Sequence, residues 1–154
     1  MKQPSYEQAL HRLASYCSHA ERCTYDIRKK LDLWEISIND QTKIIHRLQK
    51  EKFLDDSRYC RAFVNDKSKF SKWGAQKIKF ALLKKNISAS LINEALQEIN
   101  PAESREQLYS LLKKKKDSVK GKNEYEIRQK LIRFAMGRGF HMEDIEAVLS
   151  GLTS

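Results

Sequence analysis

The sequence Ile27-Arg-Lys-Lys-Leu31 recurs, with changes, as Ile78-Lys-Phe-Ala-Leu82 and as Ile127-Arg-Gln-Lys-Leu131. Each copy places an Ile and a Leu four residues apart, which puts both side chains on one face of a helix. Each copy is also followed by a second amphipathic segment. The period of about 50 residues indicates stacked helical units, because repeats of this length are typical of helical solenoids.

The later parts of the units carry the same spacing. Ile92 and Leu96 are four residues apart, as are Ile145 and Leu149, and Ile45 stands at the corresponding place in the first unit. Only two prolines and five glycines occur in 154 residues, which leaves little room for long loops or a strand-rich architecture. We therefore predict an all-α fold of nine helices, in three tandem three-helix modules that form an elongated or curved helical repeat.

The predicted modules are residues 1–54, 55–100 and 101–154. Each is too small to bury a large core alone, so contacts between modules should contribute to stability. A repeat of this kind usually presents an extended surface to a large partner rather than a pocket to a small one.

Local signals predict where several helices begin. Ser18-His-Ala-Glu21 matches a capping box and would open the second helix, and Asn100-Pro-Ala-Glu103 combines a capping Asn with a Pro at the first helical position. Asp55 and Asp56 suit the positive N-terminal end of a helix. They could also be a catalytic pair of carboxylates, but no matching base or nucleophile lies nearby in the sequence, which favours capping.

Other signals predict where helices end. Gly137 and Gly139 supply the residues expected at a helix C-terminus. Residues 117–122, which follow a run of four lysines, are predicted to be a loop.

The chain is basic throughout. It contains 30 Lys and Arg against 20 Asp and Glu, for a formal net charge of +10. The excess is +3, +4 and +3 in the three predicted modules, so the charge is not confined to a basic tail. Such a surface favours a polyanion as partner, with nucleic acid or a nucleoprotein as the first candidate.

Two segments are the densest in cations. We predict that they contact DNA or an acidic protein surface, although charge runs can also be solvated helix faces. The candidate residues are Arg58, Arg61, Lys67, Lys69, Lys72, Lys77, Lys79, Lys84 and Lys85 in the first segment, and Lys113, Lys114, Lys115 and Lys116 in the second.

A group of aromatic and aliphatic residues lies near the first of these segments. It comprises Phe53, Leu54, Tyr59, Phe63 and Trp73. Their helical spacing predicts the core of the second module, and the alternative is a partner-binding patch.

No pattern of catalytic or cofactor-binding residues emerges, so we expect neither an enzyme nor a cofactor. Cys17, His19 and Cys23 offer three soft ligands without an evident fourth, and we predict no metal site. Three scattered cysteines fit reduced intracellular thiols. The N-terminal stretch Met1-Lys-Gln-Pro-Ser-Tyr6 lacks the apolar region of a signal peptide, so we expect a cytoplasmic protein with no membrane contact.

Three stretches together resemble the RecX family, regulators of the bacterial recombinase RecA. They are Phe53-Leu-Asp-Asp-Ser-Arg-Tyr59, Trp73-Gly-Ala-Gln-Lys-Ile78 and Arg128-Gln-Lys-Leu-Ile-Arg-Phe-Ala-Met-Gly-Arg-Gly-Phe140. The resemblance covers nearly the whole chain. It implies a small cytoplasmic protein of three three-helix modules, which binds in the groove of the RecA–DNA filament and inhibits filament growth, ATP hydrolysis and strand exchange. The run Lys113 to Lys116 is not part of the family pattern.

The partners predicted on these grounds are the RecA filament and, weakly and without sequence preference, DNA. We expect the chain itself to be a monomer. The alternative is a free-standing DNA-binding protein of helix-turn-helix type, because three-helix units with a basic second helix resemble such domains.

Overall fold

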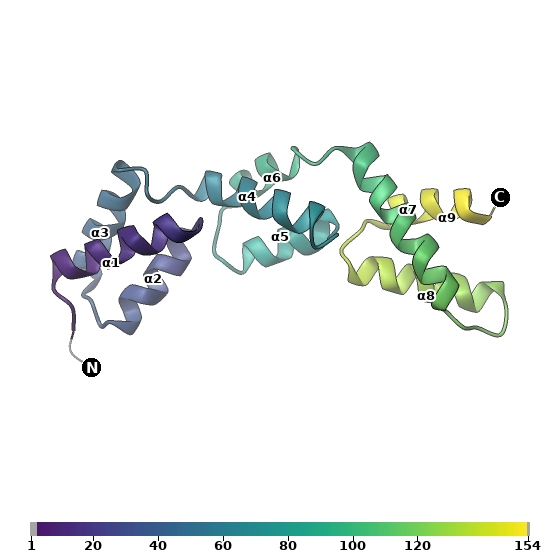
Figure 1. Cartoon of the computed structure of the whole chain (residues 1–154), viewed down its shortest axis with the longest axis horizontal. Helices are drawn as coiled ribbons and strands as arrows, with labels where there is room; N and C mark the ends of the chain where they lie inside the picture. Colours follow the sequence, from purple (N-terminus) through teal and green to yellow (C-terminus); the bar gives the residue numbers. More distant parts are fainter. Residues whose placement is uncertain (1–2, 154) are drawn as a thin grey trace. The chain divides into compact units, whose positions relative to one another are not determined.

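Nine α-helices make up the described part of the chain, residues 3–153, in the computed structural model (Figure 1). Met1 and Lys2, which belong to the N-terminal stretch discussed above, lie outside the described residues, as does Ser154. No strand occurs within residues 3–153, so the predicted all-α helical repeat is confirmed. The helices are α1 (Tyr6–His19), α2 (Thr24–Leu33), α3 (Ile38–Lys50), α4 (Asp56–Lys69), α5 (Ala75–Leu83), α6 (Ala89–Leu96), α7 (Pro101–Ser118), α8 (Glu124–Gly137) and α9 (Met142–Thr153).

Contacts divide the chain into two compact units. The first comprises the residues up to Ala62 together with Leu82–Ile92, and the second comprises Phe63–Ala81 together with the residues from Asn93 onward. The division runs through α4, α5 and α6. The three-module boundaries at residues 54 and 100 remain a prediction. None of the described helices is long and apolar enough to cross a lipid bilayer.

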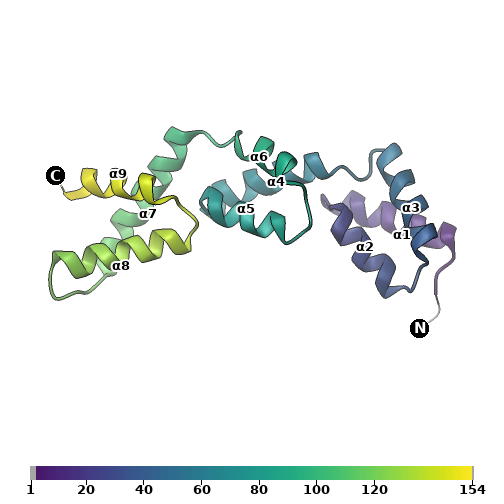
Figure 2. The same cartoon turned by 180° about the vertical axis from the view of Figure 1, so that it is seen from behind.

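The core of the first unit lies between α1, α2 and α3, which are grouped together in both views (Figures 1 and 2). Ile27 and Leu31, the first copy of the repeated pair, are completely buried there. Their spacing of four residues on α2 turns both side chains toward α1 and α3. The other completely buried members of this core are Ala9, Leu13, Ile44 and Leu48.

The residues that follow α3 fold back onto this core. Leu54 is buried in the cluster formed by α1, α2 and α3, and Phe53 packs against it. The prediction that both belong to the core of the second module is therefore wrong. The cause is local, because the amides of Phe53 and Leu54 both donate to the carbonyl oxygen of Leu48, at 2.9 and 3.2 Å, and so reverse the chain. Tyr59 is buried, whereas Phe63 and Trp73 are half-buried.

The predicted capping box at Ser18–Glu21 is wrong. Helix α1 continues to His19, and the Ser18 hydroxyl donates to the carbonyl oxygen of Ala14 at 2.9 Å, a bond that Ser can form inside a helix. Helix α2 begins only at Thr24. There the carboxylate of Asp26 accepts a hydrogen bond from the backbone N–H of Cys23, so Asp26 takes the role expected of Glu21.

Helix α7 begins where the sequence predicts and extends further than predicted at its C-terminal end. The side chain of Asn100 accepts hydrogen bonds from the amides of Ala102 and Glu103, and Pro101 is the first helical residue. Residues 117 and 118, predicted to be loop, are the last two of the helix. Lys115 and Lys116, which lie in the last turn, stabilise this end, because cations interact favourably with the negative end of the helix dipole.

A residue with left-handed backbone conformation follows each of α2, α5 and α8. These residues are Glu35, Asn86 and Gly139, with φ of 56°, 57° and 95°. After α2 and α8 the turn is closed by the same hydrogen bond, from Ile36 N–H to the Leu31 carbonyl and from Phe140 N–H to the Ala135 carbonyl. This is the bond of a Schellman motif, which ends a helix at a left-handed residue. Helix α8 ends at Gly137, so the stop predicted from Gly137 and Gly139 is confirmed.

In the second unit, α7, α8 and α9 enclose a core of their own and lie together in both views (Figures 1 and 2). Leu131 of the third repeated pair is buried in this core, whereas Ile127 is partly buried and packs against it. The completely buried residues of the cluster are Leu108, Leu112, Ala135 and Ile145.

The turn before α5 is joined to the turn after α8 by backbone hydrogen bonds. The amide of Gly74 donates to the carbonyl oxygen of Arg138 at 2.7 Å, and the amide of Gln76 donates to that of Gly139 at 2.9 Å. The guanidinium of Arg138 donates in return to the carbonyl oxygen of Ser71 at 2.8 Å. A Cβ on Gly74 would overlap the backbone of Gly139 and Phe140. We call this contact the glycine joint, because two backbones can approach so closely only where side chains are absent.

Gly74→Ala should lower the free energy of unfolding by about 2 to 4 kcal/mol, because the added methyl overpacks the glycine joint and separates its hydrogen bonds. Gly151→Ala is the matched control, since a Cβ at this position in α9 meets open space. It should leave stability unchanged or raise it by about 0.5 to 1 kcal/mol. Chemical denaturation followed by circular dichroism measures both. Equal effects of the two substitutions would contradict the role given to the joint.

Candidate functional site

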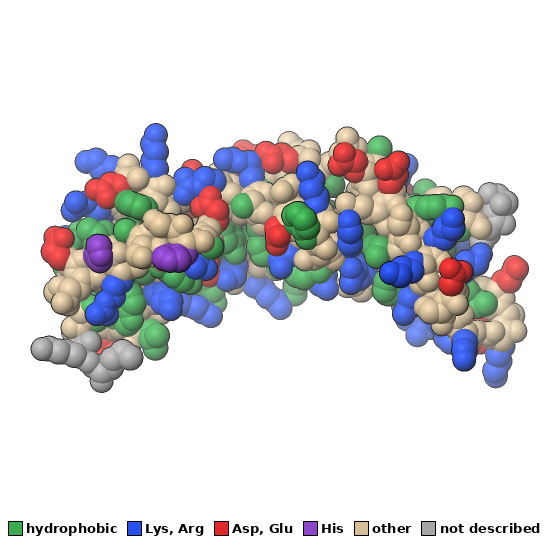
Figure 3. Space-filling model, in the orientation of Figure 1, with side chains coloured by type: hydrophobic (Ala, Val, Ile, Leu, Met, Phe, Trp, Pro, Cys, Tyr) green, Lys and Arg blue, Asp and Glu red, His purple; other side chains and the backbone are tan. Residues whose placement is uncertain are grey.

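Cationic side chains are distributed over the whole chain. On the face drawn in Figure 3, Lys and Arg side chains lie on every part of the molecule, with acidic side chains between them. This agrees with the even spread of charge along the sequence. A basic surface alone does not indicate where a partner binds. The contacts of each cation show whether it stabilises the fold or is exposed to a partner.

The structure brings the two predicted basic segments together at one groove of the second unit. Lys69 and Lys72, at and after the end of α4, line this groove together with Lys114 of α7. Its volume is about 560 Å³, and the other lining residues are Glu103, Glu106, Gln107, Ser110 and Leu111. We call it the lysine groove. Its three ammonium groups outnumber its two carboxylates, so it suits phosphates or carboxylates of a large partner.

One exposed aromatic residue beside the lysine groove escaped the sequence prediction. Phe70 lies between Lys69 and Lys72 in the chain and is exposed. Phe70 follows the last residue of α4, so helical spacing gave no signal for it. The neighbouring Lys72 has a φ of 59°, a conformation that residues other than glycine adopt only in special turns.

Several predicted cations lie over aromatic rings, including Lys85 at Tyr25 and Lys113 at Tyr109, at 5.6 and 5.9 Å. The ammonium groups of Lys67 and Lys77 lie 4.9 and 4.5 Å from the centre of the Trp73 ring. That of Lys115 lies 5.0 Å from the centre of the Phe134 ring. Such cation–π contacts hold the side chains in place. These lysines therefore stabilise the local fold and are less available to a partner than the exposed lysines of the groove.

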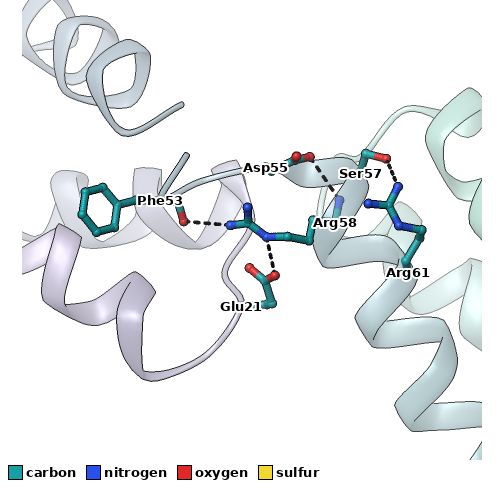
Figure 4. Close-up of polar contacts among 6 residues, drawn as sticks. All are labelled: Glu21, Phe53, Asp55, Ser57, Arg58 and Arg61. Carbon is teal, nitrogen blue, oxygen red and sulfur yellow. Dashed lines mark hydrogen bonds and ion pairs between the residues drawn. The ribbon is translucent and has the colours of Figure 1, made fainter. Parts of the chain in front are cut away.

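Arg58 serves as a bridge within the first unit (Figure 4). Its guanidinium donates to the carboxylate of Glu21, in the α1–α2 connection, and to the carbonyl oxygen of Phe53. Its own amide is capped by Asp55, as predicted for an acidic residue at a helix start. Arg58 thus ties the start of α4 to the helices before it. Arg61, one turn further on, donates to the Ser57 hydroxyl and is exposed.

Asp56 caps a helix other than the one expected. Although it is the first residue of α4, its carboxylate accepts hydrogen bonds from the backbone N–H and the hydroxyl of Thr24, at 2.8 and 3.1 Å. Thr24 is the first residue of α2. Asp56 therefore stabilises the N-terminus of α2, where a negative charge is favourable.

Lys85 is held by an ion pair in the same unit. Its ammonium group donates to the carboxylate of Asp26 at 2.6 Å. Burial by itself raises the pKa of Asp26, but hydrogen bonds from Lys85 and from the amide and thiol of Cys23 outweigh it, so the net pKa is lowered. For Lys85, burial lowers the pKa and the bond to Asp26 raises it, with a net increase. Both shifts favour the charged pair.

The buried thiols of the first unit are poorly suited to act as nucleophiles or metal ligands. Burial raises the pKa of Cys23 to about 12 and that of Cys60 to about 11. A protonated thiol is a weak nucleophile and a weak metal ligand. Within residues 3–153 no group of three or more His, Cys, Asp or Glu side chains is placed to hold a metal ion.

The remaining predicted cations are exposed. They are Lys79, Lys84, Lys113 and Lys116.

Family comparisons identify the relatives of this chain. Residues 55–96 match the model of the second three-helix domain of RecX, and residues 103–149 match that of the third. Together the two matches cover more than half of the chain. The chain belongs to the RecX family.

Individual relatives agree with this assignment. The regulatory protein RecX of Clostridium beijerinckii is 31% identical over 126 residues, which are 80% of this chain and 58% of the relative. That of Clostridium botulinum strain Eklund 17B is 34% identical over 125 residues, again 58% of the relative. The chain thus spans less than two thirds of the length of these relatives.

Two solved structures share the fold. The crystal structure of RecX from Lactobacillus salivarius has a TM-score of 0.88 at 20% identity and is matched over 96% of both chains. A second crystal structure of a regulatory protein RecX has a TM-score of 0.87 at 24% identity, over 94% of this chain and 73% of the other.

Asp26→Asn should lower the free energy of unfolding at pH 7 by about 1 to 3 kcal/mol, because it leaves Lys85 without its charged partner. The folded-state pKa of Asp26 is depressed, so the pair contributes stability above the unfolded pKa and loses it as the pH falls through the folded one. The difference from wild type should therefore shrink below about pH 4. Urea denaturation of both proteins at pH 7 and at pH 3 measures this difference in stability.

Asp117→Asn is the control for the pH experiment. Asp117 is exposed near the C-terminus of α7, and its loss should change stability by less than about 0.5 kcal/mol at either pH. A deficit of Asp26→Asn that is unchanged at pH 3 would assign the effect to packing instead of charge.

Proposed function

We propose that this chain is a negative regulator of the RecA recombinase, which binds the RecA–DNA filament and blocks its growth, ATP hydrolysis and strand exchange in DNA repair. Membership of the RecX family carries the proposal. The lysine groove supports it, because a filament of protein on DNA presents phosphates and carboxylates along its length. The regulator acts as a monomer in the cytoplasm, where the filament forms.

The mechanism proposed is occupancy. A basic helical repeat that touches more than one protomer gains avidity without any covalent step. Its presence covers surface that an incoming protomer or DNA strand requires. It can shift the assembly only as far as its affinity differs between the filament states. No cofactor and no enzymatic reaction are part of this proposal.

The deciding experiment measures ATP hydrolysis by RecA on single-stranded DNA, with the chain added at substoichiometric amounts. Wild type should inhibit. Lys69→Glu, Lys72→Glu and Lys114→Glu combined should require at least about tenfold more protein for the same inhibition, a cost of about 1.4 kcal/mol in binding. Circular dichroism and melting should change little, because exposed charges contribute little to stability.

A matched control reverses three exposed lysines outside the lysine groove. Lys43, Lys50 and Lys122 are exposed, and their change to Glu alters the net charge by the same amount. This variant should inhibit nearly as well as wild type. Equal loss in both variants would mean that net charge matters and the groove does not, and a wild type without effect on RecA would refute the proposed function.

Binding to nucleic acid alone should be weak, sensitive to salt and indifferent to sequence, because phosphate contacts release counterions and carry no sequence information. The groove variant should lower the slope of log affinity against log salt by about 2 on single strands. Fluorescence anisotropy over a range of salt measures this. Tight binding to one duplex sequence would instead favour a helix-turn-helix DNA-binding protein.

A further inference from the structure

Phe70 is the most exposed large hydrophobic side chain in the described part of the chain, at 77%. It lies in the turn after α4, between Lys69 and Lys72 in the sequence, and both of these lysines line the lysine groove. Contact of a phenyl ring with water is unfavourable. A partner that covers the ring would therefore gain free energy from its burial, in addition to the charge interactions of the groove.

The turn that carries Phe70 is held in place by hydrogen bonds to its backbone. The amides of Phe70 and Ser71 both donate to the carbonyl oxygen of Asp66, at 2.9 and 3.4 Å. The carbonyl oxygen of Ser71 in turn accepts a hydrogen bond from the guanidinium of Arg138 at 2.8 Å. The glycine joint begins three residues later, at Gly74. The backbone beneath the ring is thus fixed before a partner binds, which reduces the entropy lost on binding.

The second aromatic ring of this turn, that of Trp73, is less accessible. Trp73 is half-buried. The ammonium groups of Lys67 and Lys77 lie over its ring, 4.9 and 4.5 Å from the centre. Phe70 is therefore the ring of this turn that a partner can reach.

The side of the lysine groove formed by α7 is mainly polar. Leu111 is the one apolar side chain on this side and is half-buried, and the others are Glu103, Glu106, Gln107, Ser110 and Lys114. The centre of a protein interface usually combines several apolar side chains. Phe70 stands instead among lysines and polar groups, which suits a ligand that has a flat ring and carries negative charge.

The charges of the groove are separated along α7. Glu106 and Lys114 are eight residues apart, which is about 12 Å along the helix axis, and Glu103 lies further away still. Lys114 belongs to the run Lys113–Lys116, so positive charge exceeds negative charge at this end even though Asp117 follows the run. Phosphates can therefore bind near Lys114 without close approach to the two carboxylates of the groove.

We propose that the lysine groove binds a single strand of DNA, with one base stacked on Phe70 and the adjacent phosphates paired with the lysines. Aromatic rings beside a basic groove are typical of proteins that bind single strands, and such stacking is indifferent to sequence because every base has a π-face. Bases in a duplex are already stacked and would have to be extruded first. The proposal deepens the proposed function, on which it rests for the choice of DNA, and assigns the groove to DNA instead of protein carboxylates.

The test measures affinity by fluorescence anisotropy at low salt for three labelled probes. They are an oligothymidine strand, an abasic strand with the same number of phosphates, and a duplex of the same length. Phe70→Ala should weaken binding to oligothymidine at least about fivefold, which is about 1 kcal/mol and the lower end of the range for one stacked base. It should bind the abasic strand and the duplex within about twofold of wild type, because the phosphate contacts remain.

Two further substitutions at the same position separate stacking from apolar contact. Phe70→Leu keeps an apolar side chain without a ring and should lose as much affinity for oligothymidine as Phe70→Ala. Phe70→Trp should bind at least as tightly as wild type. Circular dichroism should show unchanged helix content in all of them, because exposed positions tolerate substitution.

Phe80→Ala is the matched control. Phe80 belongs to the same unit and is 62% exposed, but it lies on α5 and does not line the lysine groove. This variant should bind all three probes within about twofold of wild type. An equal loss of affinity for oligothymidine in Phe80→Ala would overturn the proposal, because it would mean that any exposed ring contributes.

Three other outcomes would also overturn the proposal. They are full binding of oligothymidine by Phe70→Ala, an equal loss on the abasic strand, and a loss of affinity for the RecA filament alone, which would assign Phe70 to a protein contact. These outcomes are distinct from failure of the proposed function, because the DNA probes contain no RecA. A wild type that binds oligothymidine through Phe70 but leaves RecA active would refute the proposed function and uphold the stacking site.

Discussion

The glycine joint is the constraint on which the second unit depends. Backbone amides at Gly74 and Gln76 bond to carbonyl oxygens at Arg138 and Gly139, so the turn before α5 is fixed to the turn after α8. Backbone contact of this kind demands an absence of side chains and is therefore intolerant of substitution. The lysine groove depends on this fixation, because Lys72 lies two residues before the joint whereas Lys114 lies on α7.

The cations of the chain divide into two groups that net charge does not distinguish. Arg58 and Lys85 hold ion pairs inside the first unit, and Lys67 and Lys77 lie over Trp73. These stabilise the fold, since partly buried and charge-assisted bonds contribute more than exposed pairs. The lysines of the groove, Lys69, Lys72 and Lys114, have exposed side chains instead. An acidic partner can therefore reach them, as it can the other exposed lysines.

Much of the fold could be predicted from the repeated Ile and Leu, because helical periodicity reports directly which side of a helix is buried. The Asn100–Pro101 helix start was equally readable, since capping is a local interaction. The capping box predicted at Ser18 was wrong because a serine hydroxyl can either cap a helix or form a hydrogen bond inside one. The lysine groove could not be predicted. Residues 69 and 114 are far apart in sequence, and only the packing of α4 near α7 brings them together.

The left-handed residues after the second helices bear on how such a chain can arise. Glu35, Asn86 and Gly139 end their helices through local backbone geometry, and in two of the three turns the same bond closes the motif. A turn defined by its own few residues needs no neighbour to give it shape. A duplicated segment of about 50 residues would therefore include the turn that ends its second helix. Duplication of a single ancestral segment would lengthen the chain without any change in these turns.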